Sequence, residues 1–418
     1  MSTHCWPLAL AILSLAAATP TPSVKELNHA FGLPLWTDDT LWNEEPSAVA
    51  QRLGCRPEST GTEHTSFLAR PGTPVLGTKP ETIRLSCRSN KITAILIAYA
   101  NKGDSVSPKP VRERFKNTAE YNNALLNHEK DLAALARRVS ADATTVETAL
   151  TQLFGAPERL SVGDGGALTE VVKMWRWREH AILLSVTPRE SVFVRIVPPD
   201  QVRARAKTVS DAELKKELQS RVQRRSNGDV VITEVPMISQ GLKGYCVPAT
   251  WARYLQYAGI AVDEYLLANA GNTRAGGGTV SSQMASAVAP LVARHKRRLI
   301  SLKGTLSLSL LARYIDDGLP IMWTMRCVGP FRDFGNPPNR MGNRTPEQWS
   351  EALKPARTAA HKLPRGNTEL HMCMIIGYNK TTKEIATTDS WGPGHEEKWY
   401  TLEEAQAVSR DEYYIIAW

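Results

Sequence analysis

Cys246 lies in a sequence context that favours a reactive thiol. It stands in the segment Gly244-Tyr245-Cys246-Val247-Pro248-Ala249, where a loop gives way to a predicted helix from Tyr245 to Tyr257. Pro248 suits the first turn of a helix, where no backbone donor is needed. A helix N-terminus stabilises a thiolate, the nucleophilic form of cysteine. A lone cysteine is more often buried packing, but this position predicts Cys246 as a nucleophile.

Three other side chains could act with this thiol. His371 begins the apolar strand HMCMIIGY, about 125 residues downstream of Cys246, near the range expected of a papain-type base. Asp389 falls roughly opposite His371 when a predicted β-hairpin is counted back from its turn at residues 379–383. A carboxylate there would hold the imidazole in the tautomer that a general base needs. Gln240 lies upstream of Cys246, where its amide and the Cys246 backbone N–H could donate hydrogen bonds to a developing oxyanion.

These residues, in this order, resemble a known family. Gln240 with Gly244-Tyr245-Cys246, His371 with Gly377-Tyr378, and Asp389-Ser390-Trp391-Gly392 are similar to the motifs of papain-like fold cysteine peptidases. They resemble the bacterial C39-like branch most, in which Asp commonly replaces the papain Asn. The resemblance covers residues 229–418.

The resemblance implies a role for each residue. Cys246 would be the nucleophile, His371 the general base and acid, Asp389 the orienter and Gln240 the oxyanion residue, while Trp391 would shield the His371–Asp389 hydrogen bond from water. Val247 departs from the papain pattern, in which Trp usually follows the cysteine, and the segment 329–366 is longer and more polar than a minimal domain needs. Both departures leave the substrate preference open.

The expected activity is that of an exported cysteine peptidase, which cleaves peptide bonds of a peptide or protein substrate through an acyl-enzyme on Cys246. Two alternatives stay open: an inactive papain-like binding module and a cell-wall peptide amidase. The smaller cell-wall hydrolases usually bring Cys and His closer together in sequence. No cofactor or metal is expected, because the chain has no CxxC motif and His371 with Cys373 is an isolated pair.

The first residues predict export. Leu8 to Ala18 form an apolar run that is too short to span a membrane, and Ala16-Ala17-Ala18 is typical of a signal-peptidase site, although the basic segment that usually precedes such a run is missing. Residues 1–18 are therefore predicted to be the signal peptide of a secreted or periplasmic protein. No other stretch is long and apolar enough for a transmembrane segment.

The cysteine count points to one free thiol. Five cysteines remain after Cys5 leaves with the signal peptide, and an odd number in an oxidising compartment suggests one unpaired thiol. The candidate disulfides are Cys55–Cys87 and Cys327–Cys373. Cys246 would then be left over.

The composition indicates a folded protein of two or three domains. Of the 418 residues, 42% are hydrophobic and 22% are charged, as in globular proteins. The net charge of +9 is spread along the chain, which is typical of a solvated basic surface. No nucleic-acid-binding motif is present, so a nucleic-acid partner is not expected.

The chain divides into three predicted parts after the signal peptide. Residues 24–200 form an N-terminal α+β domain with a possible internal duplication, since Ala48–Glu58 and Glu147–Glu158 each predict a helix that ends at Gly and Pro before β-rich sequence. Residues 201–228 predict a charged, exposed helical linker. Residues 229–418 predict a papain-like α+β domain with a helical subdomain followed by an antiparallel β subdomain. The N-terminal domain is expected to pack on or near the active-site cleft, as a pro-domain, an accessory domain or an inert attachment.

Overall fold

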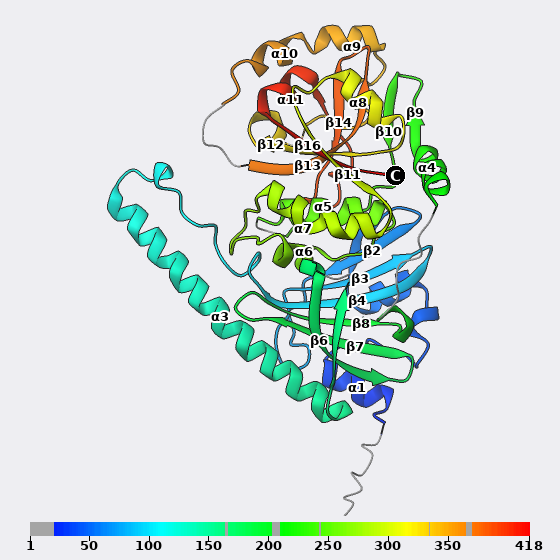
Figure 1. Cartoon of the computed structure of the whole chain (residues 1–418), viewed down its shortest axis with the longest axis vertical. Coiled ribbons are helices and arrows are strands. Elements are labelled where there is room, and N and C mark those ends of the chain that lie inside the picture. The colour runs from blue at the N-terminus through cyan, green and yellow to red at the C-terminus, as the bar shows by residue number, and fades with distance from the viewer. Residues whose placement is uncertain (1–20, 164–165, 203–209, 242–243, 334, 365–369) are drawn as a thin grey trace, which may run out of the picture.

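Two large antiparallel sheets dominate the molecule, one in each half of the chain (Figure 1). The structure, a computed structural model, describes residues 21–163, 166–202, 210–241, 244–333, 335–364 and 370–418. The predicted signal segment 1–18, with Cys5, lies outside the described residues. Helices pack on both sheets, and every strand pair is antiparallel. The predicted α+β class is therefore confirmed.

Within its described residues, the N-terminal half combines three α-helices with eight strands. Its helices are α1 (Val24–Phe31), η1 (Leu41–Asn43), α2 (Pro46–Arg52), η2 (Arg112–Arg114), α3 (Thr118–Phe154), η3 (Gly166–Leu168) and η4 (Pro199–Gln201). Its strands are β1 (Arg56–Thr60), β2 (His64–Ala69), β3 (Thr82–Arg88), β4 (Lys91–Asn101), β5 (Glu158–Gly163), β6 (Thr169–Trp177), β7 (His180–Thr187) and β8 (Ser191–Val197). The strand order β1-β2-β3-β4-β8-β7-β6-β5 reads alike from both edges toward the central β4–β8 pair. The internal duplication itself stays a prediction.

The central strands of this sheet are buried on both faces. Successive residues of a strand point to opposite faces, and in β4 the set Ile95, Ile97 and Tyr99 joins the core formed with α1, α2 and α3. The alternate residues Leu96 and Ala98 join a second cluster with side chains of the C-terminal half. The apolar run of β4 is thus explained by cover on both sides.

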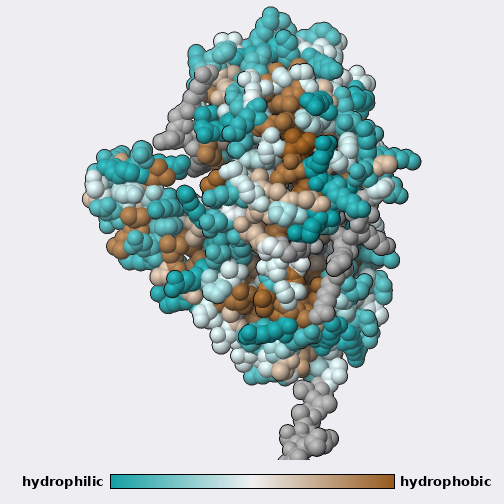
Figure 2. Space-filling view, viewed as in Figure 1, coloured by the Kyte–Doolittle hydropathy of each residue, from teal (hydrophilic) through white to brown (hydrophobic). Residues whose placement is uncertain are grey.

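Helix α3 differs from the sequence-based expectation. The sequence predicted a short helix within Glu147–Glu158, whereas in the structure these residues end one helix of 37 residues that begins at Thr118. No Gly or Pro interrupts the intervening residues, so nothing breaks the helix. The first half of α3 projects from the body (Figure 1), and its surface mixes hydrophobic with polar side chains (Figure 2), among them the exposed Leu126 and Leu132.

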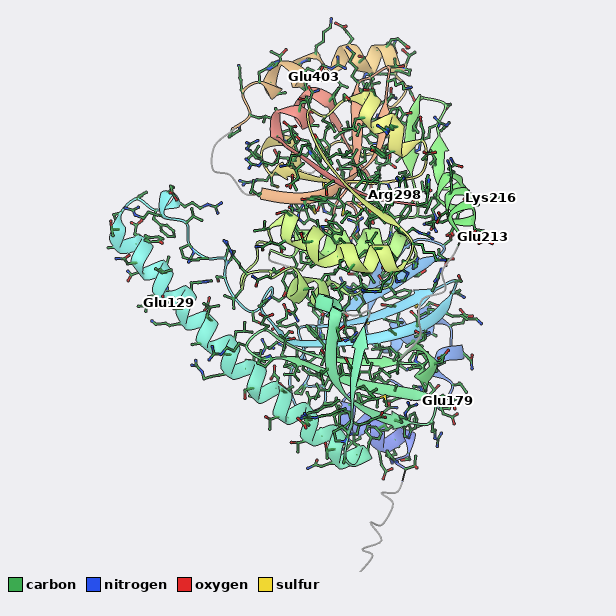
Figure 3. The ribbon with its side chains drawn as sticks, viewed as in Figure 1. Glu129, Glu179, Glu213, Lys216, Arg298 and Glu403 are labelled. Carbon is green, nitrogen blue, oxygen red and sulfur yellow. The ribbon has the colours of Figure 1, made fainter. Side chains whose placement is uncertain are left out.

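The predicted exposed linker is partly built into the C-terminal half. Helix α4 (Asp211–Ser220) buries Leu214 and Leu218 in the C-terminal core, while its Glu213 and Lys216 lie at the outer edge of the molecule (Figure 3). Strand β9 (Val222–Arg224) pairs with β10 and extends the C-terminal sheet. The expectation of a fully exposed connector was wrong, because two leucines spaced four residues apart suffice for a narrow buried face.

The C-terminal half contains the remaining helices and strands. Its helices are α5 (Cys246–Tyr257), α6 (Glu264–Ala270), α7 (Ser281–Arg294), α8 (Leu308–Ile315), η5 (Gly329–Phe331), α9 (Pro346–Ala352), α10 (Lys354–Ala360) and α11 (Leu402–Val408). Its other strands are β10 (Asp229–Ile232), β11 (Arg298–Lys303), β12 (Ile321–Arg326), β13 (Leu370–Asn379), β14 (Glu384–Thr388), β15 (Lys398–Thr401) and β16 (Ser409–Ala417). The main path of the sheet is β11-β16-β12-β13-β10-β9, with β14 and β15 added beside β13.

Strand β13 and helix α5 are packed together and form the centre of this half. Thr250 of α5 donates a hydrogen bond of 3.0 Å to the carbonyl of Met372 in β13. The predicted hairpin is confirmed as β13 and β14, and a capping box at Thr401 starts α11. Among the described helices, none is both long enough and apolar enough to cross a bilayer.

Candidate active site

The Cys246 thiol lies at the first residue of α5, as the sequence predicted. Gly244 has a φ of +42°, and a Cβ there would lie 2.0 Å from the Cα of Gly277, so only glycine allows the two loops to approach. This contact fixes the turn before α5. Cys246 is 8% exposed, and its place at a helix N-terminus suits a negative charge on the sulfur.

His371 and Asp389 form a buried hydrogen-bonded pair. The Nε2 atom of His371 lies 2.9 Å from Oδ1 and 2.8 Å from Oδ2 of Asp389. Met374 pairs with Thr388 in the hairpin, so Asp389 continues the strand opposite Cys373 rather than opposite His371. Residues two apart share a face of a strand, and such diagonal neighbours are within side-chain reach.

The imidazole of His371 is in contact with both Asp389 and Cys246. Burial by itself would lower the pKa of His371, but the charge and hydrogen bond of Asp389, together with the hydrogen bond to the Cys246 side chain, raise that pKa well above its usual range. Because Nε2 is engaged by Asp389, Nδ1 is the nitrogen left for the sulfur. The arrangement favours an imidazolium facing the thiol.

Trp391 covers the imidazole. Its indole stacks on His371 with ring centroids 4.7 Å apart and an angle of 24° between the planes. The backbone N–H of Ser390, between Trp391 and Asp389, donates to Oδ1 of Asp389 at 2.7 Å. The turn after β14 therefore donates a hydrogen bond to the Asp389 carboxylate and places the Trp391 ring against the imidazole of His371.

Gln240 is tied to the same turn. Its backbone N–H donates to the carbonyl of Ser390 at 2.8 Å. Its side-chain Oε1 is buried and makes no hydrogen bond to any of the described residues. The segment before α5 and the segment after β14 therefore meet at this bond, and the side-chain oxygen of Gln240 is left able to accept a hydrogen bond.

Arg253 is a component that the sequence reasoning missed. Its guanidinium, fully buried two turns along α5 from Cys246, donates from Nε to the carbonyl of Pro236 at 2.6 Å and from Nη1 to the Ser390 hydroxyl at 3.3 Å. It also donates to the hydroxyl of Thr388. Burial lowers the pKa of Arg253 to about 10, against the opposing effect of Asp389. The signal was an arginine inside the otherwise apolar helix CVPATWARYLQY.

The cysteines differ from the expectation. None of the five described cysteines is in a disulfide, so the candidate pairs Cys55–Cys87 and Cys327–Cys373 do not form. Cysteine counting therefore does not single out Cys246. Burial raises the pKa of the Cys55 and Cys87 thiols to about 11 and about 12, and raises that of Cys373 well above its usual range. Within the described residues, no group of three or more His, Cys, Asp or Glu side chains is placed to hold a metal ion.

The comparison with protein families identifies the half of the chain that carries these residues. Residues 232–416 match the family described as Peptidase_C39 like. The C-terminal half contains a C39-like domain. Gln240, Cys246, His371, Asp389 and Trp391 all lie within the matched range, which suggests a peptidase. No curated protein matches the chain. The match begins at the end of β10, so the N-terminal sheet lies outside the C39-like domain.

Proposed function

We propose that the protein is a thiol hydrolase, and specifically a cysteine peptidase that uses Cys246 as its nucleophile. The observation that carries the proposal is the His371 imidazole, which is hydrogen-bonded to Asp389 and in contact with the Cys246 thiol at the start of α5. In this proposal His371 is the general base and acid, Asp389 orients it, Gln240 is the oxyanion residue and Trp391 shields the pair.

The reaction proceeds by acyl transfer through a thioester. The Cys246 thiolate attacks the carbonyl carbon, and the electron pair of the C=O bond moves to the oxygen, where the Gln240 amide and the Cys246 N–H donate hydrogen bonds. The oxyanion collapses, the C–N bond breaks, and His371 gives its proton to the leaving amine. Water then gives a proton to His371 and attacks the thioester, which releases the acid and the thiolate.

The test is hydrolysis of labelled casein and of a mixed peptide library by the full chain and its Cys246→Ala variant. We expect the variant to lose activity by at least about 10³-fold, and the Cys55→Ala variant to keep it. Full activity in Cys246→Ala would refute the proposal. A binding module would retain bound peptides uncleaved in both forms, whereas an amidase would act on purified peptidoglycan and leave casein intact.

We also propose that the protein is exported and cleaved after Ala18, to a secreted or periplasmic location. The support is the apolar run from Leu8 to Ala18 with its small residues at the end. N-terminal sequencing of the protein recovered from outside the cytoplasm should begin at Thr19. Recovery of a chain that still begins at Met1 would contradict this.

We further propose that the N-terminal half packs beside the active-site cleft. The support is a pair of contacts close to the thiol. The backbone N–H of Ser239, next to Gln240, donates to Oε1 of Glu58 at 2.8 Å. The backbone N–H of Gly276, whose loop lies against Gly244, donates to the carbonyl of Lys102 at 2.8 Å.

A further inference from the structure

Residues 233–241, which follow β10, run along the N-terminal sheet. We name this stretch, which carries Gln240, the oxyanion segment. Three of its residues, Glu234, Met237 and Ser239, are hydrogen-bonded to β1 or to the turn that follows β1. The bonds are Thr62 N–H to Glu234 Oε2 (2.6 Å), Met237 N–H to Ser59 Oγ (3.1 Å) and Ser239 N–H to Glu58 Oε1 (2.8 Å). Chain segments far apart in sequence therefore fix the path of the oxyanion segment.

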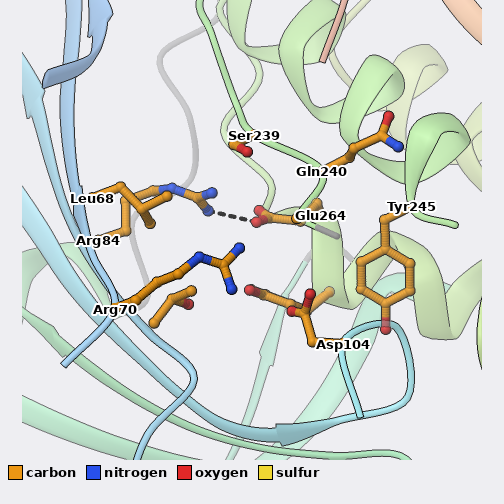
Figure 4. A pocket seen from close by; sticks show the side chains of 11 residues that line it. Leu68, Arg70, Arg84, Asp104, Ser239, Gln240, Tyr245 and Glu264 are labelled. Carbon is orange, nitrogen blue, oxygen red and sulfur yellow. Dashed lines mark hydrogen bonds and ion pairs between the residues drawn. The ribbon is translucent and has the colours of Figure 1, made fainter. Parts of the chain in front are cut away.

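A buried network of charged side chains is connected to this segment through Glu58. Arg84 of β3 donates to both carboxylate oxygens of Glu58, from Nε at 2.8 Å and from Nη2 at 3.0 Å, and from Nη1 to Glu264 of α6 at 2.5 Å. The exposed fractions of the three side chains are 9%, 1% and 3%. Figure 4 shows Arg84 reaching from the sheet to Glu264, with Ser239 and Gln240 on the segment above them. Because two carboxylates share the guanidinium of Arg84, a shift of any one of the three side chains should displace the other two.

Tyr245 forms a second link, directly before the nucleophile. Its ring is 3% exposed, and its hydroxyl accepts a hydrogen bond of 3.1 Å from the backbone N–H of Gly103. A Cβ at Gly103 would lie 2.4 Å from the ring. Tyr245 also packs edge-on against Tyr265 of α6, which contacts Phe193 of β8. The N-terminal loop after β4 is therefore seated on the residue that precedes Cys246.

We propose that the N-terminal sheet is a permanent part of the catalytic site. Glu58 and Arg84 of the sheet, and Tyr245 against which its Gly103 loop packs, are positioning residues that hold the two oxyanion donors, Gln240 and the backbone N–H of Cys246. The inference rests on the proposed function, because it concerns the same acyl transfer. Glu58 holds the amide of Ser239, one residue from Gln240, and a displacement of about 1 Å at an oxyanion donor can cost about 100-fold in rate. The N-terminal half is then neither an inhibitory pro-domain nor an inert attachment.

Two substitutions in the N-terminal half test this without altering the C39-like domain. Glu58→Gln removes the carboxylate charge that binds both the Arg84 guanidinium and the Ser239 N–H. Gly103→Ala adds a Cβ that displaces the ring of Tyr245. Each has a matched control. Glu44→Gln breaks a bidentate pair with Arg52 elsewhere in the same half, and Gly72→Ala adds a Cβ that meets no atom within 4 Å.

The assay uses p-nitrophenyl acetate as acyl donor and iodoacetamide as alkylating probe. Acylation by the ester passes through an oxyanion, whereas alkylation by iodoacetamide does not. Displacement of the oxyanion segment should therefore slow acylation and leave alkylation unchanged. We expect Glu58→Gln and Gly103→Ala to lower kcat for the ester by about tenfold to 100-fold, with KM and the alkylation rate of Cys246 within about twofold. In a Gln240→Ala background the same substitutions should add little, because coupled residues are not additive.

Unchanged kcat in both variants would overturn the inference, and so would a parallel fall of kcat and alkylation, because the sheet would then act on the sulfur or on stability rather than on the oxyanion segment. Cys246→Ala separates this from the proposed function. If that variant retains full ester hydrolysis, the proposed function fails. If it is inactive while Glu58→Gln and Gly103→Ala are fully active, only the positioning role fails.

Discussion

Asp389→Asn should move the alkaline limit of activity to lower pH. The carboxylate contacts Nε2 of His371 through both oxygens, at 2.9 and 2.8 Å, in a buried pair. It is the main cause of the raised pKa of His371, against the lowering effect of burial. Asparagine keeps the size and one acceptor oxygen but not the charge, so the variant isolates the electrostatic contribution.

The size of the shift follows from the strength of the pair. A hydrogen bond to a charged group contributes about 1.5–3 kcal/mol, and one pH unit corresponds to about 1.4 kcal/mol. Loss of the charge should therefore lower the pKa of His371, because the imidazolium loses about 1.5–3 kcal/mol of stabilisation. Because the reactive form needs an imidazolium beside the thiolate, the falling limb of the kcat/KM profile at high pH should move to lower pH.

The same pair makes a signed prediction for stability. A histidine whose pKa is raised on folding contributes stability that is fully present below its unfolded pKa and is lost as the pH rises through its folded pKa. Urea unfolding of the wild-type chain should therefore show this contribution in acid and lose it at alkaline pH, and Asp389→Asn should remove it. Asp317→Asn, a change at a partly exposed side chain in the same half, is the control. An alkaline limb that stays in place in Asp389→Asn would refute the reasoning.

Three further predictions concern the thiols, the buried arginine and a buried histidine. Iodoacetamide near neutral pH, with the adducts mapped by mass spectrometry, should label Cys246 well before the cysteines whose pKa burial raises (Cys55, Cys87 and Cys373); early labelling of those three would contradict it. Arg253→Met should cost about 2–4 kcal/mol in urea unfolding, because buried oxygens lose their donor. Burial lowers the pKa of His64 to about 4. The free energy of unfolding should therefore fall by up to about 3 kcal/mol as the pH falls from about 6.5 to 4. His64→Gln should flatten this pH dependence, and the exposed His361→Gln should not.

The sequence predicted the parts of the site that follow from local pattern. The start of α5 at Cys246 and the hairpin of β13 and β14 each depend on residues close in sequence, and both are confirmed. The structure brings Gln240, Cys246, His371, Asp389 and Trp391 together, and their catalytic roles stay predictions. The register of the hairpin differs by two residues from the expectation that Asp389 falls roughly opposite His371, and Asp389 reaches His371 diagonally.

The features that sequence reasoning missed depend on long-range contacts. Strand β11 has no fully buried residue and pairs with β16, more than 100 residues away, so its sequence carries little signal. Arg253 is polar in a buried helix, and its acceptors lie on segments distant in the chain. The disulfides were inferred from a count of cysteines, which contains no information on whether two thiols meet in space.

The sequence of strand β4 carries a signal of the packing between the two halves. Strand β4, with the sequence KITAILIAYAN, is apolar at consecutive positions, and a strand with one solvent-facing side would alternate instead. Helices α1, α2 and α3 cover one face of this strand, so the other face requires a second cover. The C39-like domain provides it through Tyr245 and Tyr265. Separation of the halves would expose Leu96, Ala98 and Phe193 to water, and the same contact surface carries the residues that hold the oxyanion segment.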